Sequence, residues 1–372
     1  MTRLICIIIL SLIGIIWQVY TLNLAKKWKC IIGLMLCLGM LYMPLGIIFK
    51  FGTIIPHELV LLCSLITSIS ILFFSIGIFR LMIVIIIFIF NIIPALNVRF
   101  YRDIFLSSKL SLVSLIVAIF LGIFASYEAA KVPTVNHYNL YYKNLPKELD
   151  GYIIAHISDT HAGVLFRQAW HEAIVKKVMA EKVNLIVHTG DMGDGTPEQV
   201  QKSIAPLLKL SAPDGVYYVM GNHENYHHIE LWRKYYQDKG LNILEAKYHL
   251  HKSLPLAIVG ASAGARATPI NYEKLLENIP QDSFTLLLDH FPSRASKAKD
   301  FVDLQLSGHT HGGTTFYLAP IVAYFNEGFV NGLYELGDMK LFVTSCVGLW
   351  SYAPLRLFVP SEIAIIHLKV LQ

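Results

Sequence analysis

Long apolar runs fill the first third of the chain, and a mixed pattern of apolar and polar positions follows. Leu4–Val19 and Ile31–Phe49 are each near the roughly 20 residues that a helix needs to span a bilayer. Leu59–Leu96 is longer and is interrupted by Arg80, and Leu110–Ser126 is a further run. The pattern therefore predicts about four transmembrane helices, with the third long or tilted.

Two alternatives to four spans follow from the same pattern. A fifth helix would need a tight turn at Arg80, and Leu81–Pro94 would then be short for a crossing. A soluble fold is disfavoured because it would leave several helices apolar all round. The first run lacks a small-residue cleavage site at its end, so we expect an anchor rather than a removed signal peptide.

Lys and Arg residues in the short loops predict the orientation, because the side richer in them faces the cytoplasm. With four crossings the globular part lies outside the cytoplasm. Five crossings would place it inside, but would leave Arg99 and Arg102 on the wrong face. With four crossings one side holds Lys26, Lys27, Lys29, Arg99, Arg102 and Lys109, and the other holds Arg3, Lys50 and Lys131.

Composition changes where the last apolar run ends. We expect a transmembrane helical region over 1–127, a linker over 128–150 and a globular domain over 151–372, which is large enough for a buried core. The 372-residue chain is 55% hydrophobic with a mean hydropathy of +0.52, and the apolar runs account for this excess. Because the net charge of +5 is modest, nucleic-acid binding is not expected.

Strands and helices alternate early in the globular domain, and strands cluster later. Gly151–Ser158, Asn184–Thr189 and Val216–Met220 are predicted strands, and Arg167–Lys182 has helical spacing. A hairpin is expected around Gly337. This order predicts an α/β domain in which helices flank a layered sheet core.

Metal-binding side chains recur in short clusters that mostly follow these apolar runs. Loops at strand ends are where side chains converge without disturbing a sheet. Any one cluster is weak evidence for a metal site, because Asp-x-His and Gly-Asp mostly occur in ordinary turns. Their joint occurrence predicts a metal site. The clusters are Asp159–His161, Gly190–Asp191, Gly221–Glu224, His290 and Gly308–Gly312.

The candidate ligands supply nitrogen and oxygen and no thiolate. This donor set favours Mn, Fe or Zn over a structural zinc, and we expect Mn. Seven ligands are too many for one four-coordinate ion, and they suit two divalent ions about 3.5–4 Å apart with one bridging carboxylate. The ligands are Asp159, His161, Asp191, Asn222, His290, His309 and His311.

The five clusters, in this order, resemble the motifs D-x-H, G-D-x-x-D, G-N-H-D/E, H and G-H-x-H of the calcineurin-like metallophosphoesterase superfamily. With its N-terminal helices and closing Pro-Leu-Arg and Pro-Ser-Glu-Ile segments, the chain is similar to the membrane-anchored bacterial branch often called YkuE-like. The resemblance implies a β-sandwich flanked by helices, with the site at the strand ends. Thr314 and the Ser345–Gly348 stretch depart from that branch, which bears on the substrate rather than on metal binding.

The resemblance also implies how the residues divide their roles. His223 matches the histidine that contacts the substrate phosphate and protonates the leaving group, so His223 and Asp191 are the expected catalytic residues. Asp194 and Glu224 would orient the ligands. Asp191 would bridge the two ions, one held with Asp159, His161 and His311 and the other with Asn222, His290 and His309.

Several residues beside the motifs favour structural roles. His156 and His188 lie within strands and are expected to be core histidines, and Cys346 is expected to be packed rather than catalytic. His227 and His228 are expected to begin a solvated helix, with a place at the pocket border as the alternative.

The predicted function is a membrane-anchored, dinuclear-metal phosphoesterase in a multi-pass membrane protein. A metal-activated water would hydrolyse a phosphomonoester, a phosphodiester or a pyrophosphate. The expected partners are the bilayer and this phosphate ester, for which the anchor leaves a lipid-linked form open. Tyr317–Phe325 is apolar and aromatic, and it is open whether it forms core, a pocket wall or a membrane-facing lip that receives a lipid tail.

Two other functions remain as alternatives. A UDP-diacylglucosamine pyrophosphatase of lipid A synthesis follows from the resemblance, but it would need a cytoplasmic domain. A non-catalytic metal-binding partner protein of the membrane is the alternative from another class. Loss of His223 or of the bridging Asp191 would favour that alternative, and both residues are present.

Overall fold

The chain forms two compact units in the computed structural model. The first comprises Met1–Glu128 and Tyr352–Leu355, and the second comprises Ala129–Ser351 and Arg356–Gln372. The residues described are 2–49, 56–90, 98–261, 269–350 and 352–371.

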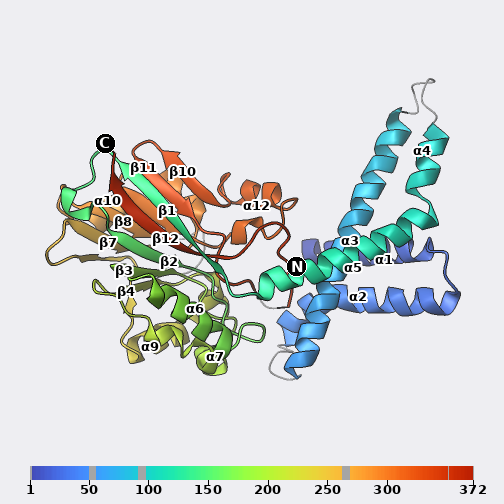
Figure 1. Cartoon of the computed structure of the whole chain (residues 1–372), viewed down its shortest axis with the longest axis horizontal. Coiled ribbons are helices and arrows are strands. Elements are labelled where there is room, and N and C mark those ends of the chain that lie inside the picture. The colour runs from blue at the N-terminus through green and yellow to red at the C-terminus, as the bar shows by residue number, and fades with distance from the viewer. Residues whose placement is uncertain (1, 50–55, 91–97, 262–268, 351, 372) are drawn as a thin grey trace. The chain divides into compact units, whose positions relative to one another are not determined.

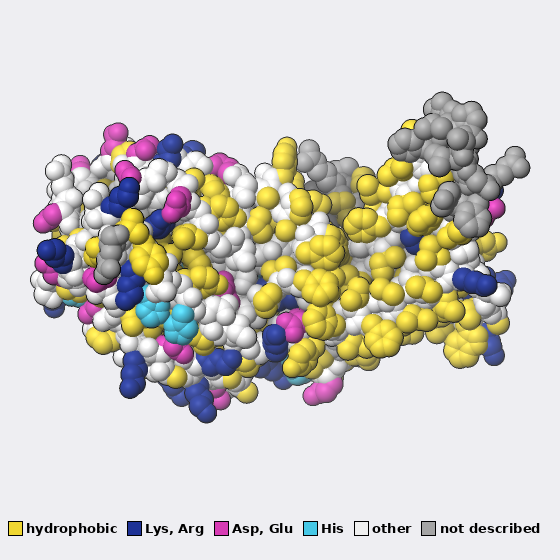
Figure 2. Space-filling view, turned by 45° about the horizontal axis from the view of Figure 1, so that its top comes forward, with side chains coloured by type: hydrophobic (Ala, Val, Ile, Leu, Met, Phe, Trp, Pro, Cys, Tyr) yellow, Lys and Arg dark blue, Asp and Glu magenta, His cyan; other side chains and the backbone are white. Residues whose placement is uncertain are grey.

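Helices, most of them apolar, make up nearly all of the first unit (Figure 1). On the face seen in Figure 2, hydrophobic side chains cover most of these helices. Within the described residues, α2, α3 and α5 are long and apolar enough to cross a membrane, and α1 is a shorter apolar helix. The four predicted runs are thus helices, of which three have full spanning length. The helices are α1 (Thr2–Tyr20), α2 (Lys26–Phe49), α3 (His57–Phe90), the short α4 (Val98–Phe105) and α5 (Ser108–Ala130).

Helix α3 continues through Arg80, where a fifth span would need a turn. The Arg80 guanidinium is buried, donates from Nη2 to the carbonyl of Phe105 at 2.7 Å, and lies 5.6 Å from the centroid of the Trp17 ring. These contacts satisfy the cation without a break in the helix. The predicted run extended to Leu96, and its last part, residues 91–96, lies outside the described residues.

The first sheet of the second unit is mixed (Figure 1). β2, β3 and β4 pair in parallel, and their central residues are apolar and buried because both faces of the sheet are covered. β12 runs antiparallel to β2. The strand order is β1 (Thr134–Tyr142), β12 (Glu362–Val370), β2 (Ile153–Ile157), β3 (Leu185–Thr189), β4 (Val216–Val219) and β5 (Asn242–Ile243).

The second sheet also has six strands. β7, β8, β9 and β11 pair in parallel, and β10 and β11 form the predicted antiparallel hairpin around Gly337. The strand order is β10 (Gly332–Leu336), β11 (Met339–Val343), β9 (Leu304–Ser307), β8 (Phe284–Leu288), β7 (Leu256–Gly260) and β6 (Lys247–Leu250).

The two sheets pack face to face with helices outside, which confirms the predicted β-sandwich flanked by helices. Ile154 and Val187 of the first sheet share one core cluster with Leu286 and Leu306 of the second. Separate clusters bury the outer faces beneath the helices. The helices are α6 (Gln168–Ala180), α7 (Pro197–Ile204) and α9 (Ile229–Asp238) on the first sheet and α10 (Tyr272–Leu276) and α11 (Ala295–Ala298) on the second.

Strand β1 lies inside 128–150, the stretch expected to be a linker. It pairs in parallel with β12 along its whole length, from Thr134 opposite Glu362 to Tyr142 opposite Val370. Its polar residues hide the strand pattern, because an edge strand leaves many side chains exposed. The stretch therefore contributes an edge strand to the first sheet.

Candidate metal centre

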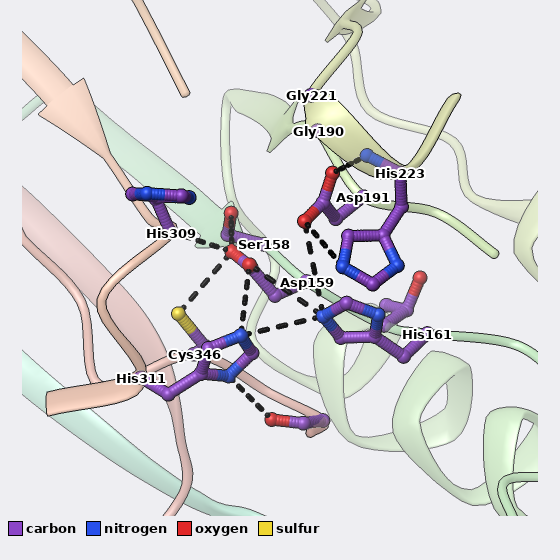
Figure 3. A network of polar contacts seen from close by, with 12 residues as sticks. Ser158, Asp159, His161, Gly190, Asp191, Gly221, His223, His309, His311 and Cys346 are labelled. Carbon is purple, nitrogen blue, oxygen red and sulfur yellow. Dashed lines mark hydrogen bonds and ion pairs between the residues drawn. The ribbon is translucent and has the colours of Figure 1, made fainter. Parts of the chain in front are cut away.

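The predicted ligands meet where strands of both sheets end. Figure 3 shows Asp159, His161, Asp191, His309 and His311 among them. β2 leads to Asp159, β3 to Asp191 and β4 to Asn222 in the first sheet. β8 leads to His290 and β9 to His309 in the second sheet. Because the parallel strands of each sheet end at one edge, loops far apart in sequence bring their side chains together.

Five of these ligands lie on a left-handed backbone. L-residues other than glycine rarely adopt it, and such conformations persist where the surrounding structure enforces them, commonly at functional sites. The φ angles are 56° at Asp159, 42° at His161, 54° at Asp191, 71° at His309 and 50° at His311.

One group of donors comprises Asp159, His161 and His311, all fully or almost fully buried. Asp159 Oδ1 lies 3.7 Å from Nε2 of His161 and 3.3 Å from Nε2 of His311, and these two nitrogens are 3.3 Å apart. This oxygen accepts no hydrogen bond within the described residues. A buried carboxylate oxygen with no hydrogen bond that faces two imidazole nitrogens fits a divalent cation.

The other oxygen of Asp159 is held by three donors. Oδ2 accepts from Oγ of Ser158 at 2.5 Å, from the backbone N–H of His309 at 3.1 Å and from Sγ of Cys346 at 3.2 Å. Burial raises the pKa of the Cys346 thiol, so it remains a donor rather than a thiolate. The donors fix the carboxylate so that Oδ1 turns toward the imidazoles.

Asp191 connects this group to a second one. Its Oδ2 lies 3.9 Å from Nε2 of His161 and 3.3 Å from Nε2 of His290. His290 Nε2 in turn lies 3.0 Å from Oδ1 of Asn222 and 3.2 Å from Nδ1 of His309. The structure thus places all seven predicted ligands in one continuous cluster, with Asp191 between its two halves.

Backbone and carboxylate partners orient the imidazoles. Nδ1 of His290 lies 2.8 Å from the carbonyl of Thr189, and Nδ1 of His311 lies 3.1 Å from the carbonyl of Gly348. A carbonyl can only accept, so each Nδ1 carries the proton and each Nε2 keeps its lone pair in the neutral ring. A lone pair on Nε2 is what a metal ion requires.

Charges within the cluster shift its acid–base equilibria in opposite directions. Burial alone would raise the pKa of Asp191, but His290 and His223 lower it below its ordinary value. Burial alone would lower the pKa of His290, but Asp191 and Asp159 raise it to about 9. The buried carboxylates therefore require a nearby cation, which a proton on imidazole or a metal ion can supply.

The family model for calcineurin-like phosphoesterases matches residues 152–313. An uncharacterized metallophosphoesterase of Campylobacter jejuni is 34% identical over 69% of this chain and 69% of its own length. This chain belongs to the calcineurin-like metallophosphoesterases. YkuE of Bacillus subtilis, an uncharacterized metallophosphoesterase, is 30% identical over 60% of this chain and 82% of its own length. A Danio rerio transmembrane protein with metallophosphoesterase domain is 27% identical over 71% of this chain and 63% of its own length.

His223 lies at the more open side of this metallophosphoesterase centre. Its side chain is 20% exposed, its Nδ1 is 2.7 Å from Oδ1 of Asp194, and its Nε2 is 3.8 Å from Oδ2 of Asp191. The same oxygen of Asp194 lies 2.7 Å from Nδ1 of His161. Asp194 therefore orients two rings, one of a predicted ligand and one of the predicted proton donor.

Glu224 joins the loops after β3 and β4. Its carboxylate accepts backbone N–H bonds from Asp191 at 3.1 Å, Met192 at 2.6 Å and Gly221 at 2.7 Å. A Cβ on Gly221 would lie 2.2 Å from Oδ1 of Asp191, so only glycine fits there. Through these three hydrogen bonds Glu224 links the loop that carries Asp191 to the loop that begins at Gly221. This link is the structural counterpart of the orienting role predicted for Glu224.

Two of the histidines beside the motifs, His156 and His188, follow the structural expectation. His156 and His188 are fully buried, and burial lowers their pKa values to about 3 and about 4. His227 is partly buried, with its ring 6.3 Å from that of His223, and His228 is exposed just before α9. His227 therefore borders the centre, which was the alternative.

The sequence did not reveal the contacts that position the predicted ligands through backbone carbonyls. The buried Arg356 donates from Nη2 to the carbonyl of Gly348 at 2.7 Å and to that of Ser345 at 2.9 Å. The carbonyl of Gly348 also orients His311. Arg356 stands in the closing Pro-Leu-Arg segment noted in the sequence, and no spacing rule connects it to the ligands.

Proposed function

We propose that this metallophosphoesterase hydrolyses a phosphate ester at a centre of two divalent metal ions. The observation that carries the proposal is the continuous cluster of buried donors, in which Oδ2 of Asp191 faces imidazoles of both halves. A carboxylate that faces both halves is placed to bridge two ions. The first ion would be held by Asp159, His161, Asp191 and His311, and the second by Asp191, Asn222, His290 and His309.

The donor atoms of the predicted ligands suit divalent metal ions of borderline softness. Imidazole nitrogen and carboxylate or amide oxygen suit Mn, Fe or Zn, and we propose Mn. Two such ions, when bound, would acidify a water and hold the phosphoryl oxygens. The buried residues around them exclude other water, which strengthens these electrostatic interactions.

His223 is proposed to contact the phosphate and to protonate the leaving oxygen. Asp194 holds its Nδ1, which leaves Nε2 as the atom that delivers the proton. The substrate bond is a phosphomonoester, a phosphodiester or a pyrophosphate. His223 and Asp191, whose loss would favour a non-catalytic domain, are both present, so we retain the enzymatic function.

We also propose that the protein is a multi-pass membrane protein with its metallophosphoesterase domain outside the cytoplasm. Within the described part of the chain, three helices of spanning length support membrane insertion. The loop charges support the orientation. This placement disfavours a UDP-diacylglucosamine pyrophosphatase, which would need its domain in the cytoplasm.

The test uses the full-length protein in detergent, stripped of metal and then given Mn²⁺. We expect restored hydrolysis of bis-p-nitrophenyl phosphate or p-nitrophenyl phosphate, reduced about a hundredfold or more in Asp191→Asn. Asp282→Asn, which changes an exposed carboxylate, is the matched control and should keep its activity. Two bound ions without turnover of either ester would contradict the enzymatic proposal.

A further inference from the structure

Five large apolar side chains project into solvent from the segments that follow His311 and Arg356. We call them the aromatic rim: Phe316, Ile321, Tyr324, Phe325 and Phe358. They are 59%, 55%, 82%, 59% and 66% exposed, respectively. Ile321, Tyr324 and Phe325 lie on helix α12 (Ala319–Phe325), in which none of the residues is buried. The stretch Tyr317–Phe325 is therefore not part of the core, which leaves the wall and lip interpretations.

One residue of the rim, Phe358, has an unfavourable backbone conformation. Phe358 has a φ of 59°, a left-handed conformation that a bulky residue rarely adopts, and yet its side chain is exposed. Its ring lies 5.9 Å from that of Phe316, and the rings of Tyr324 and Phe325 lie 5.3 Å apart. Strain that presents an aromatic ring to solvent indicates a binding role, because packing of the core does not need it.

The rim is fixed to the metal centre. A short 3₁₀ helix, His311–Gly313, contains one predicted ligand and leads directly into the rim. A β-bridge between Thr315 and Leu357 joins the two segments that contribute to it. A Cβ on Gly313 would lie 2.7 Å from Cα of Ala319, so α12 packs directly against the loop of His311. The rim therefore lies beside the loop that carries this predicted ligand.

The chemistry of the rim favours an apolar occupant. The stretch 314–326 contains no charged residue, so it offers no ion pair to a polar partner. Isolated exposed apolar residues need no explanation, but several adjacent ones mark a binding surface. Aromatic side chains are also the residues enriched where protein meets the interfacial region of a bilayer.

A short connection joins the metallophosphoesterase domain to a helix that can cross a membrane. Only residues 131–133 separate α5 from β1. Ala129, at the end of α5, lies in one small apolar cluster with Leu349, against which Trp350 packs. The Trp350 ring lies 4.8 Å from that of His311. Because this connection is so short, a membrane lipid is an apolar molecule within reach of the domain.

We propose that the aromatic rim binds the acyl chains of a membrane lipid whose phosphate group occupies the metal centre. This inference rests on the proposed phosphoesterase function and names its substrate class. Hydrolysis joins the oxygen of a water to phosphorus and breaks one P–O bond, and the leaving oxygen takes a proton. The rim would hold the chains while the phosphate reaches His223 and the ligands.

The first test compares two chromogenic diesters with the same leaving group, p-nitrophenyl hexadecyl phosphate and p-nitrophenyl methyl phosphate. Both are offered to the full chain in phosphatidylcholine nanodiscs with Mn²⁺. We expect kcat/KM for the hexadecyl ester to exceed that for the methyl ester about tenfold or more, since a few buried methylene groups suffice for that ratio. Combined Ile321→Ser, Phe325→Ser and Phe358→Ser substitutions should reduce the ratio at least about fivefold.

Leu231→Ser is the matched control, because Leu231 is 49% exposed on α9, away from the rim segments, and the variant should keep the wild-type ratio. Equal turnover of the two esters, or an unchanged ratio in the triple variant, would overturn the inference and leave the phosphoesterase function standing. Failure to hydrolyse either ester would instead contradict the proposed function and the inference together.

The second test needs no turnover. Phosphatidylcholine with a photoreactive diazirine on its acyl chain is incorporated into the nanodiscs, and cross-linked residues are mapped by mass spectrometry. Adducts are expected in α12 and at Phe358, with α2, α3 and α5 as internal positive controls and the exposed face of α9 as the negative control. Labelled helices with an unlabelled rim would overturn acyl-chain binding.

Discussion

At the scale of single residues, the two carboxylate oxygens of Asp159 have different partners. Oδ2 of Asp159 takes donors from the preceding residue, Ser158, and from the distant Cys346, whereas Oδ1 is left for the imidazoles. The same principle recurs at His290 and His311, where a carbonyl fixes one ring nitrogen and frees the other. The geometry of the predicted ligands here depends on groups outside the ligand set.

Glu224 provides a direct test of this dependence. In Glu224→Gln, the amide NH₂ would replace one carboxylate oxygen and face a backbone N–H of Met192 or of Asp191 and Gly221. Because the loops after β3 and β4 would lose an acceptor, we expect Mn²⁺ affinity to fall about tenfold or more. Isothermal titration of the metal-free protein in detergent measures the effect.

Glu230→Gln is the control for that measurement, because it makes the same change at an exposed carboxylate on the neighbouring α9. It should bind Mn²⁺ as the wild type does. Wild-type affinity in Glu224→Gln would show that the three N–H bonds do not position the ligands.

At the scale of elements, apolar runs predicted the structure wherever burial is two-sided. The strands that lead to Asp159, Asp191 and Asn222 are buried on both faces, so their runs are continuous and the ligands stand just after them. β1 was missed because an edge strand keeps many polar side chains, and its pattern resembles a linker.

Sequence also left the exposure of α12 open. Hydrophobicity alone does not distinguish a helix packed in the core from one that presents its side chains outward, and α12 presents Tyr324 and Phe325. The carbonyl partners of His290 and His311 could not be predicted from the sequence either. Every residue has a carbonyl, and only the folded backbone decides which one points toward a ring.

Strand β2 carries a histidine that should make stability depend on pH. His156 is fully buried, its Nε2 lies 2.8 Å from the Thr189 hydroxyl, and its Nδ1 has no hydrogen-bond partner within the described residues. Burial, with a smaller effect of His188, lowers its pKa to about 3 from an ordinary value near 6.5. The folded state thus keeps this ring neutral at pH values where the unfolded chain protonates it.

The contribution of His156 is therefore fully present above about pH 6.5 and is lost as pH falls toward 3. Between pH 6.5 and pH 5 the wild type should lose roughly 2 kcal/mol more stability than His156→Gln, which cannot titrate. Chemical unfolding in detergent with EDTA, followed by tryptophan fluorescence, measures both. Parallel pH dependence in the two proteins would mean that His156 takes up its proton without unfolding.

At the scale of the whole molecule, the side of the membrane on which the domain lies does not depend on α1. With α2, α3 and α5 spanning, the segments around Lys26–Lys29 and Arg99–Lys109 share one side, and β1 begins on the other. Adding α1 as a fourth span moves only the N-terminal residues. The count of spans and the side of the domain are therefore separate questions, and our proposal for the second rests on the loop charges.

This orientation predicts the behaviour of reporter fusions. Fusion after Ser107, between α4 and α5, should give fluorescent green fluorescent protein and inactive alkaline phosphatase. Fusion after Pro133, beyond α5, should give the reverse, because alkaline phosphatase needs the disulfides that form outside the cytoplasm. Changing Arg99, Arg102 and Lys109 to Gln should weaken this contrast, since these charges help to set the orientation. Active phosphatase after Ser107 together with fluorescence after Pro133 would place the domain in the cytoplasm. A lipid phosphate substrate would then have to be sought in the inner leaflet of the membrane.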